Sequence, residues 1–180
     1  MSHTLYVLLT RFPDRGSKVI GALTEEYYTH ASLGLAEDPN TFYSFVYKGF
    51  IEEKITRYLK PGRAPFPCKL YELQVSDRVY RAVKRLIYHF QTVKPTLSYT
   101  NFGVVCSLLH VPYRRHRSYF CSQFVAYALG STGAVRLKKQ VPLYLPGDVS
   151  RLPGLKLRFR GNMYQMAQMF SLPVPQLNAA

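Results

Sequence analysis

Two residues of this sequence, a cysteine and a histidine, are placed where they could perform nucleophilic chemistry. Cys121 stands at the predicted start of an apolar helix, where free backbone N–H groups and the helix dipole stabilise a thiolate. The same N–H groups could stabilise the oxyanion of an acyl-transfer intermediate. With a histidine nearby, such a position is typical of a thiol whose pKa is lowered. A buried cysteine that acts only as a small apolar side chain is the alternative.

His30 is the second candidate for chemistry. It lies in the segment THASLGL, residues 29–35, whose alternation predicts a strand with one apolar face and one face of small or polar residues. Ser32 and Gly34 share the face of His30 and would leave space for a second group to approach. A histidine that is only hydrogen-bonded within the fold is the alternative.

The elements that must position these two residues are strands and helices in irregular order. Strands are predicted at residues 5–10, 29–35, 41–47, 69–75 and 155–160. Helices are predicted at residues 18–23, 49–59, 99–110 and 119–129, and in a segment that begins after Ser76 or Asp77. Because there is no regular β-α-β rhythm, the favoured fold class is α+β, with a mostly antiparallel sheet packed against helices.

Length and composition favour one globular domain. The 180 residues are 47% hydrophobic and 19% charged, which excludes a disordered chain and predicts a single domain over residues 1–180. We assign residues 162–180 to a C-terminal extension, whose methionines at helical spacing predict packing or a dimer contact. No apolar run reaches the roughly 18 residues of a membrane span.

The cysteine pattern indicates free thiols. Cys68, Cys106 and Cys121 are an odd number at wide spacing, without a secretory signal, which predicts a reducing, cytoplasmic location. No CxxC or HxxxH pair occurs, so we expect no zinc site, and no motif predicts a cofactor.

The charge predicts anionic partners. The formal net charge is +14, and the run RRHR at residues 114–117 concentrates positive charge shortly before Cys121. An acidic carrier protein or an anionic surface would be attracted by such a chain. Nucleic acid is a less favoured partner, because no nucleic-acid-binding motif is evident.

Four segments together resemble a known family. YYTHASLGL, FYSFVYKG, YTNFG and YFCSQFVAYAL occur in this order between about residue 5 and residue 160. They resemble the permuted papain-like amidase family, the YaeF/YiiX-like branch of the NlpC-type superfamily. In that family a histidine strand precedes the cysteine helix, as His30 precedes Cys121 here. The resemblance implies a circularly permuted, papain-like fold.

The resemblance also implies roles for individual residues. Cys121 would be the nucleophile, and His30 would be the general base that later protonates the leaving group. The family places a third polar residue on the next strand, which corresponds to Ser44. Ser44 departs from the family pattern, because a hydroxyl cannot stabilise an imidazolium as a carboxylate does. Glu72 or a backbone carbonyl are the alternatives for this third role.

The function that the resemblance implies is that of a cysteine-nucleophile hydrolase, similar to an amidase or peptidase, which would cleave an amide, ester or thioester bond through an acyl-enzyme thioester. One alternative is an acyl or peptidyl transferase that forms an amide from a thioester held by an acidic carrier protein. Hydrolysis and transfer share every residue up to the last step. A second alternative, of another class, is a non-catalytic basic module that binds nucleic acid or an acidic protein.

Overall fold

The computed structural model describes residues 2–11, 27–60 and 64–174. Six strands of this part form one antiparallel sheet in the order β4-β3-β2-β1-β5-β8. Their bounds are β1 (Ser2–Thr10), β2 (His30–Leu35), β3 (Thr41–Val46), β4 (Gly49–Lys54), β5 (Pro67–Ser76) and β8 (Lys156–Asn162). The predicted α+β class with a mostly antiparallel sheet is confirmed. The helix predicted at residues 18–23 lies outside the described residues.

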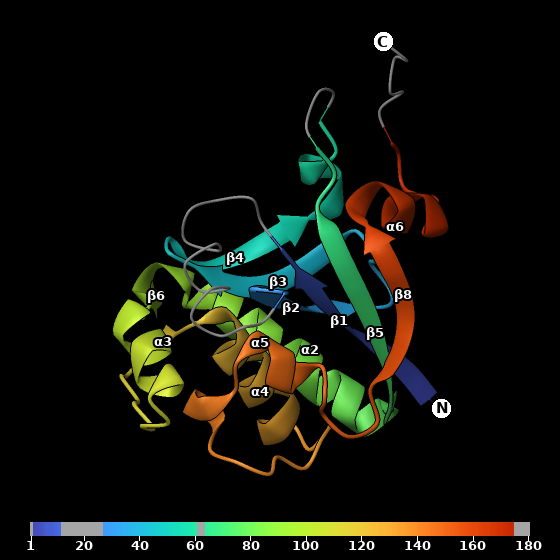
Figure 1. The fold of residues 1–180 in the computed structure, drawn as a ribbon. Helices are drawn as coiled ribbons and strands as arrows, with labels where there is room; N and C mark the ends of the chain where they lie inside the picture. Colours follow the sequence, from blue (N-terminus) through green and yellow to red (C-terminus); the bar gives the residue numbers. More distant parts are fainter. Residues whose placement is uncertain (1, 12–26, 61–63, 175–180) are drawn as a thin grey trace.

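Helices cover both faces of the sheet. α2 (Asp77–Thr92), α4 (Cys121–Ser131) and α5 (Pro146–Val149) lie along one face, below the sheet in Figure 1. They bury the larger hydrophobic core, to which β2 contributes Ala31, Leu33 and Leu35. On the other face, α6 (Met163–Met169) and the 3-10 turn η1 (Ile55–Tyr58) cover a smaller core. The sheet is therefore buried on both sides where the candidate residues lie.

α2 forms as its sequence predicts. Ser76 is the N-cap, and its hydroxyl accepts a hydrogen bond of 3.4 Å from the backbone N–H of Val79. Apolar residues then recur at helical spacing and are buried against the sheet: Tyr80, Val83, Ile87 and Phe90. This helix holds the sheet and α4 in one core, because Phe90 also packs against Phe124 of α4.

The predicted helix at residues 49–59 is wrong. A two-residue turn at 47–48 is followed by Gly49 at φ 93°, and the chain reverses into β4, which pairs with β3. A turn closed by a glycine in this left-handed region is a common hairpin connection. Only the last part of the segment is helical, as the single turn η1. The apolar spacing that suggested one helix joins residues of a strand to residues of this turn.

A small parallel pair of strands brings the cysteine helix beside another helix. β6 (Ser98–Tyr99) pairs with β7 (Ser118–Tyr119), and the two strands lead into α3 (Asn101–Leu108) and α4. Both helices therefore begin two residues later than predicted. The later start makes Cys121 the first residue of α4. Of two further 3-10 turns, η2 (Lys94–Thr96) lies between α2 and β6, and η3 (Val141–Leu143) lies between α4 and α5.

The methionines of the predicted C-terminal extension lie on a helix that packs on the sheet. Met163 and Met166 are buried in the smaller core, together with Leu8 and Phe42 of the sheet. In the described ranges, no helix is long and apolar enough to cross a membrane.

Candidate active site

Cys121 is the first residue of α4, at the end of the helix where backbone N–H groups have no acceptor within the helix. The N-cap residue, Phe120, has an extended backbone and supplies no side-chain cap, so the first N–H groups of α4 are left for other acceptors. Backbone N–H groups of Ser122 and Ala31 donate to the Cys121 sulfur. The helix itself is fixed, because Phe124, Val125 and Leu129 are fully buried. The sequence therefore holds a sulfur atom rigidly beside backbone donors.

His30 lies between the sulfur and a carboxylate. It is the first residue of β2, and its imidazole is hydrogen-bonded to the Cys121 side chain. Its Nε2 lies 2.5 Å from Oε1 of Glu53 on β4. This contact leaves Nδ1 as the ring nitrogen that can reach the thiol. The exposed fractions are only 6% for Cys121 and His30 and 4% for Glu53, so the three side chains interact away from bulk water.

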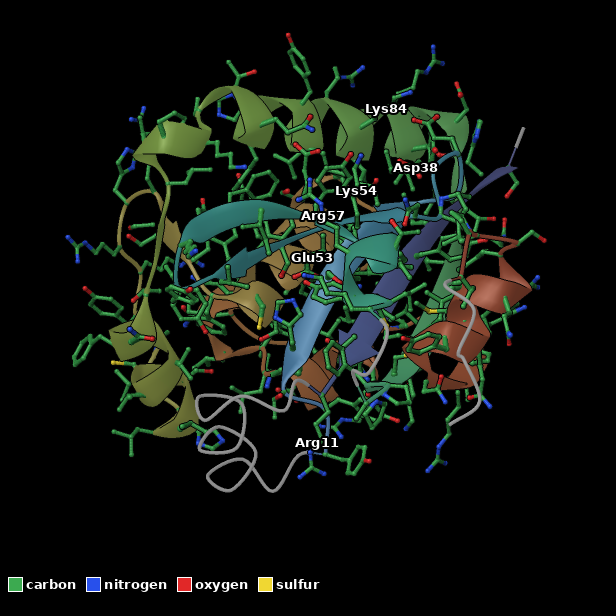
Figure 2. The ribbon with its side chains drawn as sticks, turned by 90° about the horizontal axis from the view of Figure 1, so that it is seen from above. Arg11, Asp38, Glu53, Lys54, Arg57 and Lys84 are labelled. Carbon is green, nitrogen blue, oxygen red and sulfur yellow. The ribbon has the colours of Figure 1, made fainter. Side chains whose placement is uncertain are left out.

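The sheet register explains why Glu53 reaches His30. Glu53 lies directly opposite Phe42, and residues in opposite positions share a face of the sheet. The Phe42 ring lies against Gly34, where an added Cβ would be 2.7 Å from Phe42 Cε1. Gly34 and His30 share a face because they are four positions apart on β2. The glycine thus lets Phe42 fill the space that the sequence suggested was open. In Figure 2, Glu53 lies near the middle of the molecule, over the sheet.

The electrostatics of the three residues favour an ion pair. Burial lowers the pKa of His30, but the Glu53 carboxylate and the Cys121 hydrogen bond outweigh it and raise that pKa to about 10. Burial raises the pKa of Cys121, but the His30 hydrogen bond and charge and the two backbone donors bring it below its ordinary value. These shifts favour a thiolate beside an imidazolium over the pair of neutral side chains.

The residues considered for the third role lie elsewhere. The Ser44 hydroxyl donates a 2.6 Å hydrogen bond to the Ala31 carbonyl, so its proton serves the β2 backbone. Glu72 lies on β5 with its carboxylate 3.7 Å from Arg158. The acid that contacts the imidazole is Glu53, which sequence reasoning missed because residues 49–59 were assigned to a helix. The signal in the sequence was the spacing of Ile51, Glu53 and Ile55, which are two residues apart and would place a carboxylate on the same face of a strand as two apolar residues.

The other two cysteines differ from Cys121 in their surroundings. Cys68 is fully buried in the smaller core, and burial raises the pKa of its thiol to about 12. Cys106 is buried within α3. All three cysteines are free thiols, as the sequence predicts.

The basic loop, residues 114–117, borders a pocket on the first turns of α4. The pocket has a volume of about 230 Å³, and Gln123 and Tyr127 of α4 form part of its wall. The run RRHR therefore lies beside the helix that carries Cys121, where positive charge can attract an anionic group.

No group of three His, Cys, Asp or Glu side chains in the described ranges is arranged to hold a metal ion. In comparisons with known proteins, no family model and no curated protein matches this sequence. The chemistry of the site therefore rests on its own geometry.

Proposed function

We propose that this protein is a thiol enzyme that transfers or hydrolyses acyl groups through a thioester on Cys121. One observation carries the proposal: a buried imidazole bridges the sulfur at the start of α4 and the carboxylate of Glu53. A nucleophile, a base and a group that orients the base are the parts of a cysteine acyl-transfer site.

The proton and the bonds move in a defined order in this reaction. The Cys121 proton resides on His30 in the resting ion pair, and the thiolate attacks the carbonyl carbon of an amide, ester or thioester. The tetrahedral intermediate collapses as the C–N, C–O or C–S bond breaks and His30 gives its proton to the leaving group. A water molecule or an amine, deprotonated by His30, then attacks the thioester and releases Cys121.

Backbone donors at the start of α4 are suited to the charge that develops in this step. The oxyanion of the tetrahedral intermediate forms one bond from the sulfur, close to the N–H of Ser122, which now donates to the sulfur. The positive end of the α4 dipole favours negative charge at the same place. Glu53 keeps the imidazole oriented and stabilises its protonated form.

A circularly permuted, papain-like fold is part of the proposal. Its support is the order of the elements, with the histidine on the early strand β2 and the cysteine on the later helix α4, packed against the same antiparallel sheet. The resemblance of the four sequence segments to the permuted amidase family agrees with this order.

Acyl transfer to an amine and hydrolysis differ only in the acceptor. The basic loop next to α4 favours substrates or carriers with negative charge, whichever acceptor is used. An acyl group delivered as a thioester on an acidic carrier protein is one such substrate.

The proposal is tested with p-nitrophenyl acetate. Incubation should release p-nitrophenolate and add one acetyl group to Cys121, located by mass spectrometry of the digested protein. The Cys68→Ala variant should react like the wild type, because Cys68 is buried in the smaller core. Equal release by Cys121→Ala, or acetylation spread over lysines instead of Cys121, would contradict the proposal.

A further inference from the structure

An exposed apolar surface adjoins the basic loop. Exposed large apolar side chains gather on α3 and just after it, with exposed fractions of 61% for Phe102, 49% for Val105, 69% for Leu109 and 52% for Val111. Phe102, Val105 and Leu109 recur at helical spacing on one face, whereas the opposite face is buried. α3 lies at the periphery, away from the six-stranded sheet (Figure 1). We call these four residues the α3 surface.

The end of α3 directs the chain from the apolar residues to the arginines. His110 has φ 58°, and the N–H of Val111 donates to the Cys106 carbonyl at 2.8 Å, which closes the helix as a Schellman motif. Tyr113 follows, and its ring packs edge-on against Phe102 with the centroids 4.9 Å apart. The next residues are the basic loop, whose side chains are exposed. The positive residues therefore follow the apolar residues directly along the chain, and Tyr113, which lies between them, contacts Phe102.

The arginines of this surface have no acidic partner in the described part of the chain. The Asp and Glu side chains in that part form their ion pairs with other basic side chains, and none of them pairs with Arg114, Arg115 or Arg117. Large exposed apolar side chains often mark an interaction site, and three guanidinium groups without an acidic partner among the described residues attract an anionic partner.

We propose that the α3 surface and the basic loop bind the surface of an anionic lipid bilayer. A peripheral helix with projecting Phe and Leu side chains needs a shaped groove on a protein partner, but a bilayer accepts such side chains without any groove. A second copy of this chain, docked through the same surface, would bring two basic loops together and cause repulsion. The pocket of about 230 Å³ behind the loop can receive the phosphate of a headgroup.

The test of this surface uses no activity, so its outcome is separate from that of the proposed chemistry at Cys121. Co-sedimentation is measured with vesicles of phosphatidylcholine alone and of phosphatidylcholine mixed with phosphatidylglycerol. The wild-type protein should bind the mixed vesicles and lose this binding as salt increases. Phe102→Ser combined with Leu109→Ser should weaken binding by about tenfold or more. Arg114→Glu combined with Arg117→Glu should weaken it by about 25-fold or more, at about fivefold for each arginine.

Matched controls separate this surface from net charge and general hydrophobicity. Arg78→Glu with Arg85→Glu changes the net charge equally on the exposed face of α2, and Leu157→Ser removes an apolar side chain that is 55% exposed on β8. Both controls should bind the mixed vesicles almost as the wild type does, and thermal unfolding should show that every variant is folded.

Three results would overturn the proposal. The first is a wild type that does not bind the mixed vesicles, and the second is an α2 control that loses as much binding as the basic-loop variant. Binding of duplex DNA through the basic loop, with no dependence on Phe102 or Leu109 and no vesicle binding, would assign the surface to nucleic acid instead.

Discussion

The reactivity of Cys121 depends on the two groups that His30 contacts. In the buried setting, the Glu53 carboxylate on one side of the imidazole stabilises the positive charge that the ring carries once it has taken the thiol proton on its other side. Cys121 and Cys68 are both buried, but Cys121 has His30 and two backbone N–H groups beside its sulfur, whereas burial alone raises the pKa of Cys68. The proposed chemistry is therefore a property of the contacts and not of the thiol alone.

Replacing Glu53 should affect catalysis, whereas replacing Ser44 should affect stability. Glu53→Gln removes the charge that stabilises the imidazolium, so we expect kcat for an ester substrate to fall by about a hundredfold or more. Ser44→Ala removes the donor to the Ala31 carbonyl and should lower the free energy of unfolding by about 1 kcal/mol, with kcat nearly unchanged. Steady-state kinetics and urea unfolding of both variants measure this. The reverse pattern would return the third role to Ser44.

The pH profile should show a lowered pKa for Cys121 and a raised pKa for His30. The Cys121 pKa is lowered, so the thiolate, and with it the rate of alkylation, should persist to pH values below the ordinary thiol range. The His30 pKa is raised to about 10, so acyl transfer, which needs the imidazolium as an acid, should decline only as the pH rises through about 10. In Glu53→Gln the alkaline decline should move to lower pH. An unmoved decline would show that Glu53 does not stabilise the imidazolium.

At the scale of elements, alternation and capping predicted most of the molecule. β2 and α2 formed as expected, because alternating apolar residues and the Ser76 cap are local signals. The helix predicted at residues 49–59 was wrong because this segment forms a strand only by pairing with β3 through the turn before Gly49, and such pairing is not a local signal in the sequence. The pairing of His30 with Cys121 was predicted from the resemblance to the permuted family, but Glu53 is brought to them only by the register of that hairpin.

The packing of Phe42 on Gly34 gives a test of this register. In Gly34→Ala, the new Cβ would lie 2.7 Å from Phe42 Cε1, so the ring must move, and the free energy of unfolding should fall by about 1–3 kcal/mol. Adding Phe42→Leu should recover part of the loss, because the smaller side chain makes room. Urea unfolding of the single and double variants measures the coupling. Purely additive effects would mean that the two residues are not packed as described.

At the scale of the whole molecule, the site lies in a sheet that is covered on both faces. The larger core fixes α4 and therefore the sulfur, while the smaller core fixes Phe42, which lies opposite Glu53. α6 closes this smaller core, although its sequence lies in the segment that we assigned to an extension. The helix is therefore expected to contribute to the stability of the site.

Two methionines of α6 should differ in their importance. Met166 is fully buried, so Met166→Ala should lower the free energy of unfolding by about 2–5 kcal/mol. Met169 is 37% exposed, and Met169→Ala should change it by about 0.5 kcal/mol or less. Equal, small effects in chemical unfolding would show that α6 does not belong to the folded core.

The most direct test of the central claim is the rate of alkylation of each cysteine by iodoacetamide at about pH 6, read by mass spectrometry of the digested protein. We predict that Cys121 is labelled faster than Cys68 and Cys106, and that His30→Ala abolishes this preference. Labelling of Cys121 that is no faster than that of the other two thiols, or that is unchanged in His30→Ala, would contradict the account.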